Sequence, residues 1–401
     1  MSIHLTTTTV VAGLLASWSL RADPSPSPSS VPPVETAYVS ALPGVAPPAE
    51  PPGAELTDRG RMVRGVYVPV PKARAAKPAA FVAWLRGMGA TAVVLDVKDD
   101  HGRVTFTDDL PMAKGAPHKN VPNLPALVAA LKQAGIYVIG RLVCFKDDQL
   151  PQAYPGTAVR DARTGKPWRD HAGFAWVDPH SMIAHEHIAQ VARAAEALGV
   201  DEIQLDYMRF PVERGSWSTR FPNRVGAPER YELIAALLER VDRAIHIPLS
   251  ADVFGLTAYR PGDEDGLGQS LEHMAPYLDA ISPMLYVANF PPLLWQNQTP
   301  GRNYSRIHAG VEQIRRRLGD RVAVRPLLQG FSWRADKYGP SFIRNQIDAS
   351  MTAGSSGFLF WNQGGDYGQV STVWKRLEPW PAPAGSAPEP LALSEKRADP
   401  Q

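Results

Sequence analysis

The chain has 401 residues, with 42 basic and 40 acidic side chains, and its net charge of +2 gives no global field that would favour a nucleic-acid partner. This length allows one large domain or two of ordinary size. The single cysteine, Cys144, excludes an internal disulfide and a cysteine-based zinc site. It lies in the apolar run "YVIGRLVCF", which predicts a buried thiol.

The amino-terminal segment contains an apolar run from Val10 to Leu20 that has the length of a signal peptide and is too short to span a bilayer. We expect residues 1–22 to be an export signal. An uncleaved anchor is the alternative, because the basic residues that usually precede such a run are missing. A secreted, periplasmic or cell-envelope location follows from this expectation. No later run approaches transmembrane length, so no further span is expected.

Two proline-rich segments flank a region of ordinary composition. Ten of the 39 prolines fall between Asp23 and Gly53, mixed with Ser, Ala and Glu. A segment of this kind cannot bury a core, which predicts a disordered linker over residues 23–58. The tail over residues 380–401 has the same composition and is expected to be disordered as well. Residues 59–379 therefore form the predicted domain.

Within this domain, short β-rich runs alternate with longer segments in which apolar residues recur at helical spacing. Several helical segments end in Gly immediately before the next run, which is a helix stop signal. Near-continuous apolar strands separated by helices indicate a parallel sheet that is covered on both faces. The expected strands are 65–70, 92–97, 137–143, 202–207, 248–254, 280–286, 322–328 and 357–361.

Eight such units, each a strand followed by a helix, predict an α/β fold of the (β/α)8 TIM-barrel class, with long insertions after the third, fourth and sixth strands. A doubly wound open sheet is the alternative, and the lack of a G-x-G-x-x-G motif after the first strand weighs against it. In a barrel the carboxyl ends of the strands converge on one mouth, where the chemistry takes place. We expect polar and aromatic groups to share this rim, while the strand interiors are apolar. The rim residues are Tyr67, Asp96, Lys98, Arg141, Asp206, Arg209, Asp252, Tyr286, Gln329, Trp361 and Asn362.

Two carboxyl groups that face each other across the mouth can hydrolyse a glycosidic bond. One stays protonated and donates to the leaving oxygen, while the other is ionised and attacks the anomeric carbon or activates water. We assign Asp206 as the ionised partner, because the positive charge of Arg209 follows it closely. We assign Asp252 as the acid, because its apolar neighbours in "SADVFG" favour the protonated form.

The other rim residues are predicted to bind substrate. Aromatic rings offer flat apolar surface on which sugars can stack, and Trp295 and Trp333 could join Tyr286 and Trp361 in this role. An Asp at a strand end can also cap the following turn, and Asp99 and Asp100 are expected to do so after the second strand. No cofactor and no metal are expected. The remaining predicted substrate-binding residues are Tyr67, Asp96, Lys98, Arg141, Arg209, Gln329 and Asn362.

The strand ends also carry a family resemblance. The blocks "RGVYVP", "AVVLDVKDDHG", "VIGRLVCFKD", "DEIQLDYMRFP", "LSADVFG", "ISPMLYVANF", "RPLLQGF" and "GFLFWNQGG" resemble the strand ends of the glycosyl hydrolase-like domain family of the DUF4015 type. The resemblance implies a TIM barrel distantly similar to α-amylase-like and α-galactosidase-like glycosidases, acting on carbohydrate. In those relatives the nucleophile lies at the end of strand 4, which matches Asp206, and the acid comes from strand 5 or 6. The sixth strand here ends without a carboxylate, which favours Asp252 in the fifth.

Two other functions stay open. A metal-dependent hydrolase would carry His-x-His at the end of the first strand, but that strand ends "VYVPVP", and His185 and His187 lie in a helical stretch. A non-catalytic saccharide-binding barrel would keep the aromatic rim without needing an acid and a nucleophile. The insertion after the third strand contains "DARTGKPW", an expected hairpin turn, and should cover the mouth. Its Trp168 or Trp176 either contacts substrate or packs inside the insertion.

Overall fold

The computed structural model describes residues 55–107, 109–110, 121–263, 265–290, 300–335 and 337–377. The predicted signal over residues 1–22, the linker before residue 55, the tail over residues 380–401 and Trp295 lie outside the described residues. Within the described ranges, no helix is both long and apolar enough to cross a membrane.

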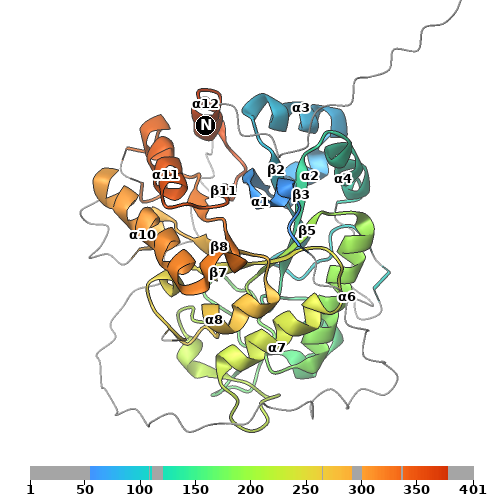
Figure 1. The fold of residues 1–401 in the computed structure, drawn as a ribbon. Coiled ribbons are helices and arrows are strands. Elements are labelled where there is room, and N and C mark those ends of the chain that lie inside the picture. Colours follow the sequence, from blue (N-terminus) through green and yellow to red (C-terminus); the bar gives the residue numbers. More distant parts are fainter. Residues whose placement is uncertain are drawn as a thin grey trace, which may run out of the picture.

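The core of the molecule is a closed ring of parallel strands, which confirms the predicted TIM barrel (Figure 1). The ladder runs in the order β10-β11-β1-β2-β3-β5-β7-β8-β9, and a pairing of Leu327 in β10 with Met284 in β8 closes it. The strands are β1 (Val63–Val68), β2 (Ala92–Lys98), β3 (Tyr137–Val143), β5 (Glu202–Asp206), β7 (Leu249–Phe254), β8 (Ala280–Met284), β9 (Ala323–Val324), β10 (Leu327–Gln329) and β11 (Gly357–Trp361).

The seventh barrel position differs from the single strand expected over residues 322–328, because two short strands, β9 and β10, occupy it. Arg325 and Pro326 separate them. Proline has no backbone N–H and cannot donate to a ladder, which explains an interruption at this point. The chain nevertheless continues in the same direction, so the barrel keeps eight strand positions.

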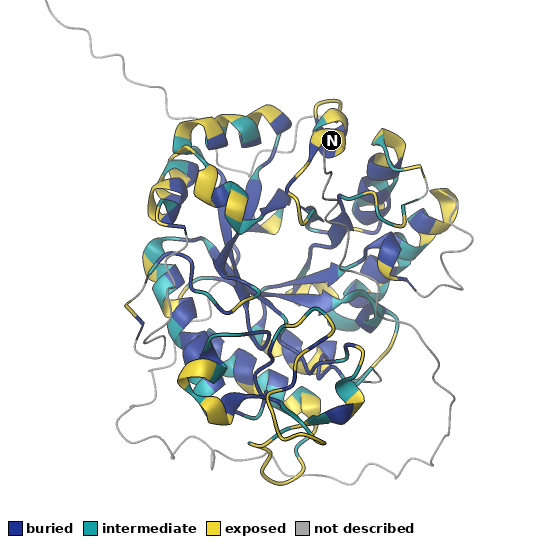
Figure 2. Cartoon of the chain, turned by 180° about the vertical axis from the view of Figure 1, so that it is seen from behind, coloured by how far each residue is buried: buried dark blue, intermediate teal, exposed yellow. Residues whose placement is uncertain are grey.

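Helices cover the outer face of the closed sheet and strand side chains fill its inner face, so the strands appear almost wholly buried in Figure 2. The main apolar cluster lies between sheet and helices. Gly89 (φ 85°) and Gly199 (φ 98°) end α3 and α6 in the left-handed conformation, as the Gly stop signals predicted. The helices are α1 (Asp58–Arg61), α2 (Val70–Ala75), α3 (Pro78–Met88), α4 (Leu124–Gln133), α5 (Leu150–Ala153), α6 (Met182–Leu198), α7 (Arg230–Asp242), α8 (Leu271–Met274), α10 (Pro300–Leu318), α11 (Pro340–Thr352) and α12 (Gly368–Trp374).

One expected helix is much reduced. After β7 the chain forms only the four-residue α8 with short 3-10 turns on either side, instead of a full-length helix. The connections after β3 (residues 144–181) and β5 (residues 207–229) are long, as predicted. The connection after β2, residues 99–123, is long as well and was not anticipated.

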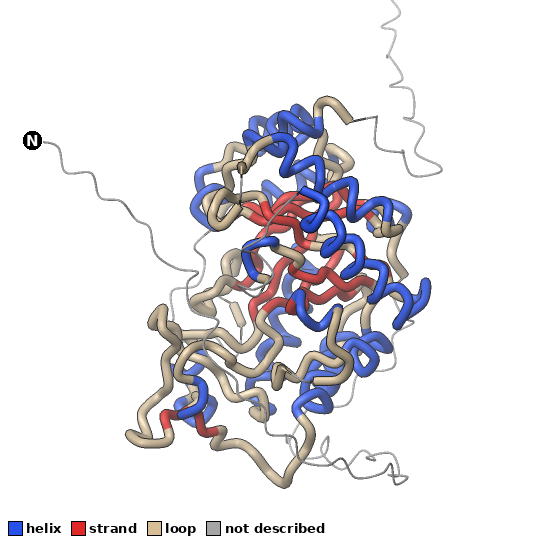
Figure 3. The backbone as a smooth tube through the Cα atoms, turned by 90° about the vertical axis from the view of Figure 1, so that its left-hand side faces the viewer, coloured by secondary structure: helices blue, strands red, loops and turns tan. Residues whose placement is uncertain are grey.

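The connections after β3 and β5 come together as a lid, which Figure 3 shows as the loop-rich part beside the barrel. Strand β4 (Arg160–Asp161) of the first pairs antiparallel with β6 (Thr219–Arg220) of the second. The predicted hairpin turn forms, since Asp161 N–H donates to Lys166 O at 2.9 Å and Asp161 Oδ1 accepts from Thr164 N at 2.9 Å. Trp168 and Trp176 are 5% and 0% exposed, so both rings pack inside the lid and neither of the two is available to substrate.

The barrel lumen has two halves of opposite character. Strands β11, β1, β2 and β3 point apolar and aromatic side chains inward, and these form a second apolar cluster. On β5 and β7 the inward positions are polar, and Ser282 adds a polar residue from β8, so the expectation of apolar strand interiors is wrong for this half. Side chains two apart on a strand share one face, which places these polar residues in the lumen. They are Glu202, Gln204, Asp206, Ser250, Asp252 and Ser282, all buried.

Candidate active site

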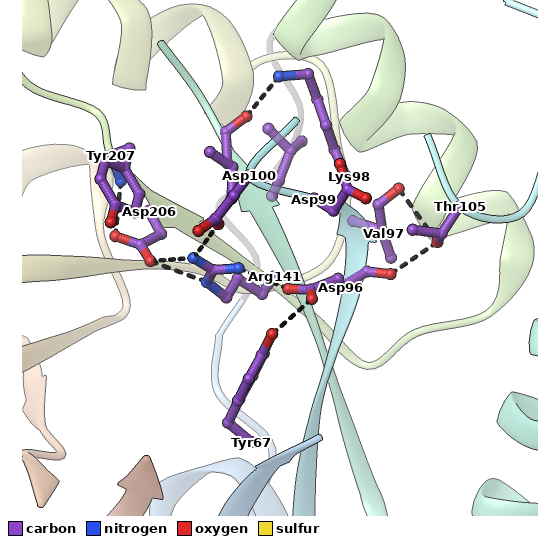
Figure 4. A network of polar contacts seen from close by, with 12 residues as sticks. Tyr67, Asp96, Val97, Lys98, Asp99, Asp100, Thr105, Arg141, Asp206 and Tyr207 are labelled. Carbon is purple, nitrogen blue, oxygen red and sulfur yellow. Dashed lines mark hydrogen bonds and ion pairs between the residues drawn. The ribbon is translucent and has the colours of Figure 1, made fainter. Parts of the chain in front are cut away.

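Arg141 of β3 is the centre of a polar network at the mouth (Figure 4). Its guanidinium donates through Nε to Asp206 Oδ2 at 2.8 Å, through Nη1 to Asp96 Oδ1 at 2.6 Å and through Nη2 to Asp100 Oδ1 at 2.9 Å. The side chain is 1% exposed. These three carboxylates raise the pKa of Arg141 well above its ordinary value against the opposing effect of burial. One guanidinium thus contacts three carboxylates.

Asp206 ends β5 and accepts hydrogen bonds on both oxygens. Besides Nε, Arg141 Nη2 contacts Oδ2 at 2.7 Å, and the backbone N–H of Tyr207 donates to Oδ1 at 2.7 Å. The expectation that Arg209 is its cationic partner is wrong, because Arg209 pairs with Glu213 at 2.6 Å. Arg209 lies beyond the strand end, where its side chain turns into the lid. The residue that pairs with Asp206 comes instead from the neighbouring strand, β3.

Asp252 lies on β7, the strand that pairs with β5, and neither of its carboxyl oxygens has a hydrogen-bond partner among the described residues. The residue is 1% exposed. Burial raises its pKa well above the ordinary value, and the negative charge of Asp206 raises it further. These surroundings favour the protonated form of Asp252. Tyr286 is buried nearby, and burial raises its pKa well above the ordinary value.

Tyr67, Asp96 and Trp361 form the opposite side of the mouth. Tyr67 Oη donates to Asp96 Oδ2 at 2.7 Å. Burial raises the pKa of Asp96 to about 6, although the adjacent Arg141 opposes the shift. The ring of Trp361 stacks on Tyr67 with 3.8 Å between centroids and 15° between planes. Because Arg141 lies 4.9 Å from the Trp361 centroid, the indole is bound on two sides and its orientation is fixed.

Three predicted substrate-binding residues have their polar groups bound within the protein. Lys98 is fully buried and contacts Asp147 Oδ2 at 2.8 Å and Val143 O at 2.7 Å. Gln329 is also fully buried and donates to the carbonyls of Phe331 and Trp333, while its Oε1 accepts from Ala288 N.

Asn362 donates to the carbonyls of Gly330 and Asp366 and accepts from Gly364 N, and so shapes a turn. For Lys98, Gln329 and Asn362, the structure therefore shows scaffold contacts in place of the expected contacts to sugar hydroxyls.

The remaining predicted aromatics that the structure describes are Tyr286 and Trp333. Tyr286 packs edge-on against Phe331, with 5.8 Å between centroids. It also lines a small crevice of about 20 Å³ together with Phe254 and Phe290. Trp333 is half-buried under Arg334, whose guanidinium lies 4.2 Å from the ring centroid. Asp206 and Asp252 lie close enough to Tyr286 to influence its pKa.

Sequence reasoning missed two charged residues of the mouth, Asp100 and Lys146. Asp99 shapes the turn as expected, since its Oδ1 accepts from the backbone of His101 and Arg103. Asp100 instead contacts Arg141, and its Oδ2 lies 3.5 Å from Lys146 Nζ. With 36% of its side chain exposed, it is the most accessible carboxylate of the network. The spacing of Asp96 and Asp100 across "DVKDD" was a signal that could have revealed it.

Tyr207 is the third residue that was missed. Its φ of 50° lies in the left-handed region, which is costly for a bulky side chain and is found mostly where function fixes the backbone. The ring lies 4.7 Å from Lys146 Nζ and contacts Trp176 edge-on at 5.8 Å. Tyr207 thus joins the strand that carries Asp206 to the lid.

Within the described ranges, no group of three or more His, Cys, Asp or Glu residues is arranged to hold a metal ion. His185 and His187 are both buried in α6, and His185 Nε2 lies 2.8 Å from Pro179 O. Cys144 is a buried free thiol, as predicted, and burial raises its pKa.

Comparison with known proteins shows to which family the chain belongs. The family model described as "Putative glycosyl hydrolase domain", DUF4015, matches residues 65–367. The chain belongs to this family. The DUF4015 match extends over all eight strand positions and over Asp96, Arg141, Asp206 and Asp252. No curated protein sequence matches the chain.

Solved structures are similar to this chain, and two of them share its fold. The PgaB (BpsB) glycoside hydrolase domain from Bordetella bronchiseptica superposes with a TM-score of 0.58 at 14% identity, covering 78% of this chain and 98% of that one. Alpha-L-fucosidase isoenzyme 2 from Paenibacillus thiaminolyticus gives a TM-score of 0.53 at 13% identity, covering 79% and 49%. A hypothetical protein from Ruminiclostridium thermocellum is 30% identical over 47% of this chain and 97% of that one, with a TM-score of 0.42.

Proposed function

We propose that the protein is a glycoside hydrolase that cleaves an O-glycosidic bond of a poly- or oligosaccharide with Asp206 and Asp252. Membership of the DUF4015 family supports this class of reaction and a carbohydrate substrate. One observation carries the choice of residues. Asp206 accepts hydrogen bonds on both oxygens, from Arg141 and a backbone N–H, whereas Asp252 has no partner on either. Surroundings that hold one carboxyl charged and the other neutral are what glycoside hydrolysis requires.

In the proposed reaction, Asp252 donates its proton to the glycosidic oxygen as the bond from that oxygen to C1 breaks. Asp206 either attacks C1 to form an ester or takes a proton from the water that attacks C1. If an ester forms, water hydrolyses it and returns a proton to Asp252, so both carboxyl groups regain their starting states. The excess of carboxylates around Arg141 stabilises the positive charge that develops on the sugar ring.

Asp100 is a second candidate for the catalytic pair, because Asp252 is enclosed while Asp100 is 36% exposed. Burial favours its neutral form, but the charges of Arg141 and Lys146 outweigh that effect and lower the pKa of Asp100. An ionised, accessible carboxylate would act as a base or nucleophile and not as the acid. Asp252 therefore remains the proposed acid, whether Asp206 or Asp100 is the ionised partner.

The test is release of reducing ends from a panel of polysaccharides by the full chain. We expect the wild type to turn over at least one glycan and Asp206→Asn to lose about 10³-fold in kcat/KM, which is about 4 kcal/mol of transition-state stabilisation. Asp348→Asn, on the exposed surface of α11, is the matched control and should keep full activity.

Substrates with different leaving groups separate the roles. A variant that lacks the acid, Asp252→Asn, should lose activity on polysaccharides but keep it on aryl glycosides whose leaving group needs no proton. A variant that lacks the nucleophile or base loses both, and Asp100→Asn should behave in this way only if Asp100 replaces Asp206. A wild type that binds a glycan and never releases reducing ends would instead make the protein a non-catalytic saccharide-binding barrel.

We also propose that this reaction takes place outside the cytoplasm, because residues 1–22 have the pattern of an export signal. Detection of the mature chain only in cytoplasmic fractions would contradict export without affecting the assignment of Asp206.

A further inference from the structure

The lid carries a strongly positive surface that the proposed reaction does not use. Segments 160–169 and 214–224 together contain seven basic residues and one acidic residue, a net charge of +6, whereas the whole chain has a net charge of +2. The remaining sequence is therefore net negative by four charges, with 35 basic and 39 acidic residues. We call these two segments the basic lid surface. Positive charge is concentrated here and not spread over the molecule.

The two segments form one continuous structure. Arg160 and Asp161 of β4 pair with Arg220 and Thr219 of β6. Ala162 N–H donates to Ser218 O at 2.7 Å, and Ser218 Oγ donates to Asp161 Oδ2 at 3.2 Å. Arg160 and Arg220, which are 60 positions apart in the sequence, are thereby held side by side.

The acidic residue of the surface is already engaged. Asp161 Oδ1 accepts hydrogen bonds from the backbone N–H groups of Arg163 and Thr164, at 3.0 and 2.9 Å. These contacts fix the turn and lower the pKa of Asp161. The guanidinium of Arg163 lies at 3.8 Å from Oδ2 and is 72% exposed, so it is only weakly paired.

Most of the positive charge has no counter-charge within the protein. Arg160 lies directly opposite Arg220 across the strand pair, and like charges in this position destabilise a sheet. The Arg160 guanidinium contacts only the carbonyl oxygens of Pro155 and Gly165. Among the residues that the structure describes, no carboxylate forms an ion pair with Lys166, Arg214, Arg220 or Arg224, all of which are exposed. A surface that places unpaired guanidinium groups side by side is suited to an anionic ligand.

An exposed indole lies among these charges. Trp217 is 81% exposed, and it is the most exposed large apolar side chain of the described chain. The other two tryptophans of the lid, Trp168 and Trp176, are buried, so the lid has a formed apolar core without it. An isolated indole in water costs solvation free energy, but it offers a flat face on which a sugar ring can stack.

The basic lid surface is fixed to the strand that carries Asp206. The ring of Trp176 packs edge-on against Tyr207, which follows Asp206 directly. Arg209 lies 4.9 Å from the Trp176 ring centroid and pairs with Glu213, the residue immediately before Arg214. Short, buried contacts therefore link the surface to the catalytic strand.

We propose that the basic lid surface binds an anionic polysaccharide, a chain with repeated carboxylate, phosphate or sulfate groups, and that this polymer is the substrate. A sugar ring stacks on Trp217 while Arg214, Arg220 and Arg224 pair with the anionic groups on either side. The identification of this polymer as the substrate rests on the proposed function, whereas the binding itself does not. A nucleic acid is disfavoured, because the net charge of –4 on the rest of the chain would repel a long polyanion that extends beyond the lid.

The test is binding of the full chain to soluble polymers, measured by affinity electrophoresis and calorimetry. The probes are polygalacturonate, dextran sulfate, neutral dextran and single-stranded DNA, and the Asp206→Asn background removes turnover. We expect both anionic glycans to bind more tightly than neutral dextran or DNA. Their affinity should fall about tenfold between roughly 50 and 200 mM salt.

Variants locate the binding. The triple variant Arg214→Glu/Arg220→Glu/Arg224→Glu should lose at least about tenfold in affinity for the anionic glycans, and Trp217→Ala about fivefold. A matched triple variant, Lys77→Glu/Arg321→Glu/Lys375→Glu, makes the same change in net charge on exposed residues away from the lid and should bind like wild type. Unchanged melting temperatures confirm that all variants fold.

Three outcomes overturn the proposal: no binding to either anionic glycan, equal or tighter binding to DNA or neutral dextran, or equal losses in the two triple variants. If binding holds while no glycan is hydrolysed, the anionic surface stands and the proposed hydrolase function fails. If a neutral glycan is the only polymer hydrolysed, the hydrolase stands and the substrate assignment fails.

Discussion

Two buried ionic networks lie at opposite ends of the barrel lumen and differ in their charge balance. At the amino-terminal ends of the strands, Arg325 meets a single carboxylate, Glu202, with Nη1 at 3.0 Å from Oε2, and both side chains are fully buried. Tyr137 Oη donates to the same carboxylate at 3.0 Å, and Ser250 donates to its other oxygen. At the mouth, Arg141 meets three carboxylates.

The difference shows how contacts between an arginine and carboxylates serve stability at the amino-terminal end of the barrel and chemistry at its mouth. The lower network, at the amino-terminal ends of the strands, has matched charges, and both carboxylate oxygens of Glu202 accept hydrogen bonds, while Arg325 Nε has no partner among the described residues. The upper network, at the mouth, carries more negative than positive charge. Burial raises the pKa of Asp252, and the negative charge of Asp206 in this network raises it further. Replacing Glu202 and Asp252 by their amides should therefore have opposite effects on stability.

The largest effect is expected for Glu202→Gln. The substitution leaves the guanidinium of Arg325 buried without a counter-charge, and breaking a buried pair in this way costs about 3–5 kcal/mol. Urea unfolding at neutral pH measures the loss. Glu239→Gln is the control, since it removes an exposed pair with Arg243 on α7 and should change stability by less than about 0.5 kcal/mol. A loss below about 1 kcal/mol for Glu202→Gln would contradict a structural role for the lower network.

An intermediate effect of opposite sign is expected for Asp252→Asn. The folded-state pKa of Asp252 is raised, so the unfolded chain releases this proton at a lower pH than the folded chain does. Wild-type stability from this group is fully present below about pH 4 and is lost as the pH rises toward the folded-state value. The amide does not titrate, so the variant should gain at least about 1 kcal/mol over wild type at pH 8 and nearly nothing at pH 4.

Calorimetric melting temperatures across this pH range check the prediction for Asp252. An amide variant that is less stable than wild type at pH 8, or one whose gain is the same at both ends of the range, would show that the carboxyl is not protonated in the folded chain.

The smallest effect is expected for Asp100→Asn. This carboxylate pairs with Arg141 and Lys146, and its lowered pKa makes its contribution to stability present at neutral pH and lost as the pH falls through the folded-state value. Because its side chain is 36% exposed, solvent screens the pair and the loss at pH 7 should stay below about 1 kcal/mol. Melting at pH 7 and at pH 3 measures it, and a loss as large as that of Glu202→Gln would mean that the mouth network also stabilises the fold.

The barrel could be predicted from the sequence because its signal is repeated eight times. Each strand–helix unit is marked by an apolar run or by a Gly at the helix end, such as Gly89 or Gly199. One irregular unit therefore does not change the prediction of a barrel. The exceptions have local causes. Pro326 divides the seventh strand, and the short α8 follows β7 where a full helix was expected.

For the candidate site, the sequence could predict which residues lie at the rim but not how they pair. Strand register placed Asp96, Arg141, Asp206 and Asp252 in one mouth, but it could not show which cation pairs with which carboxylate. Arg209 is closer to Asp206 in the sequence, whereas Arg141 is closer in space, because neighbouring strands bring residue 141 beside residue 206. Lys98 lies at a strand end as well, yet it is buried against Asp147. The β2–β3 register shifts between Asp96 and Lys98, and this irregularity breaks the alternation that would otherwise place both side chains on one face.

The interrupted seventh strand also bears on how a ligand enters. On the mouth side, β8 and β10 share the single bridging pair of Met284 and Leu327, and each of the two chain segments contains a proline, Pro283 and Pro326, that lacks an N–H. This junction has fewer paired residues than the others in the ring, so we expect it to be the place where the ring would widen. Asp252, on the strand next to β8, is the enclosed carboxyl that such an opening would expose to a glycosidic oxygen.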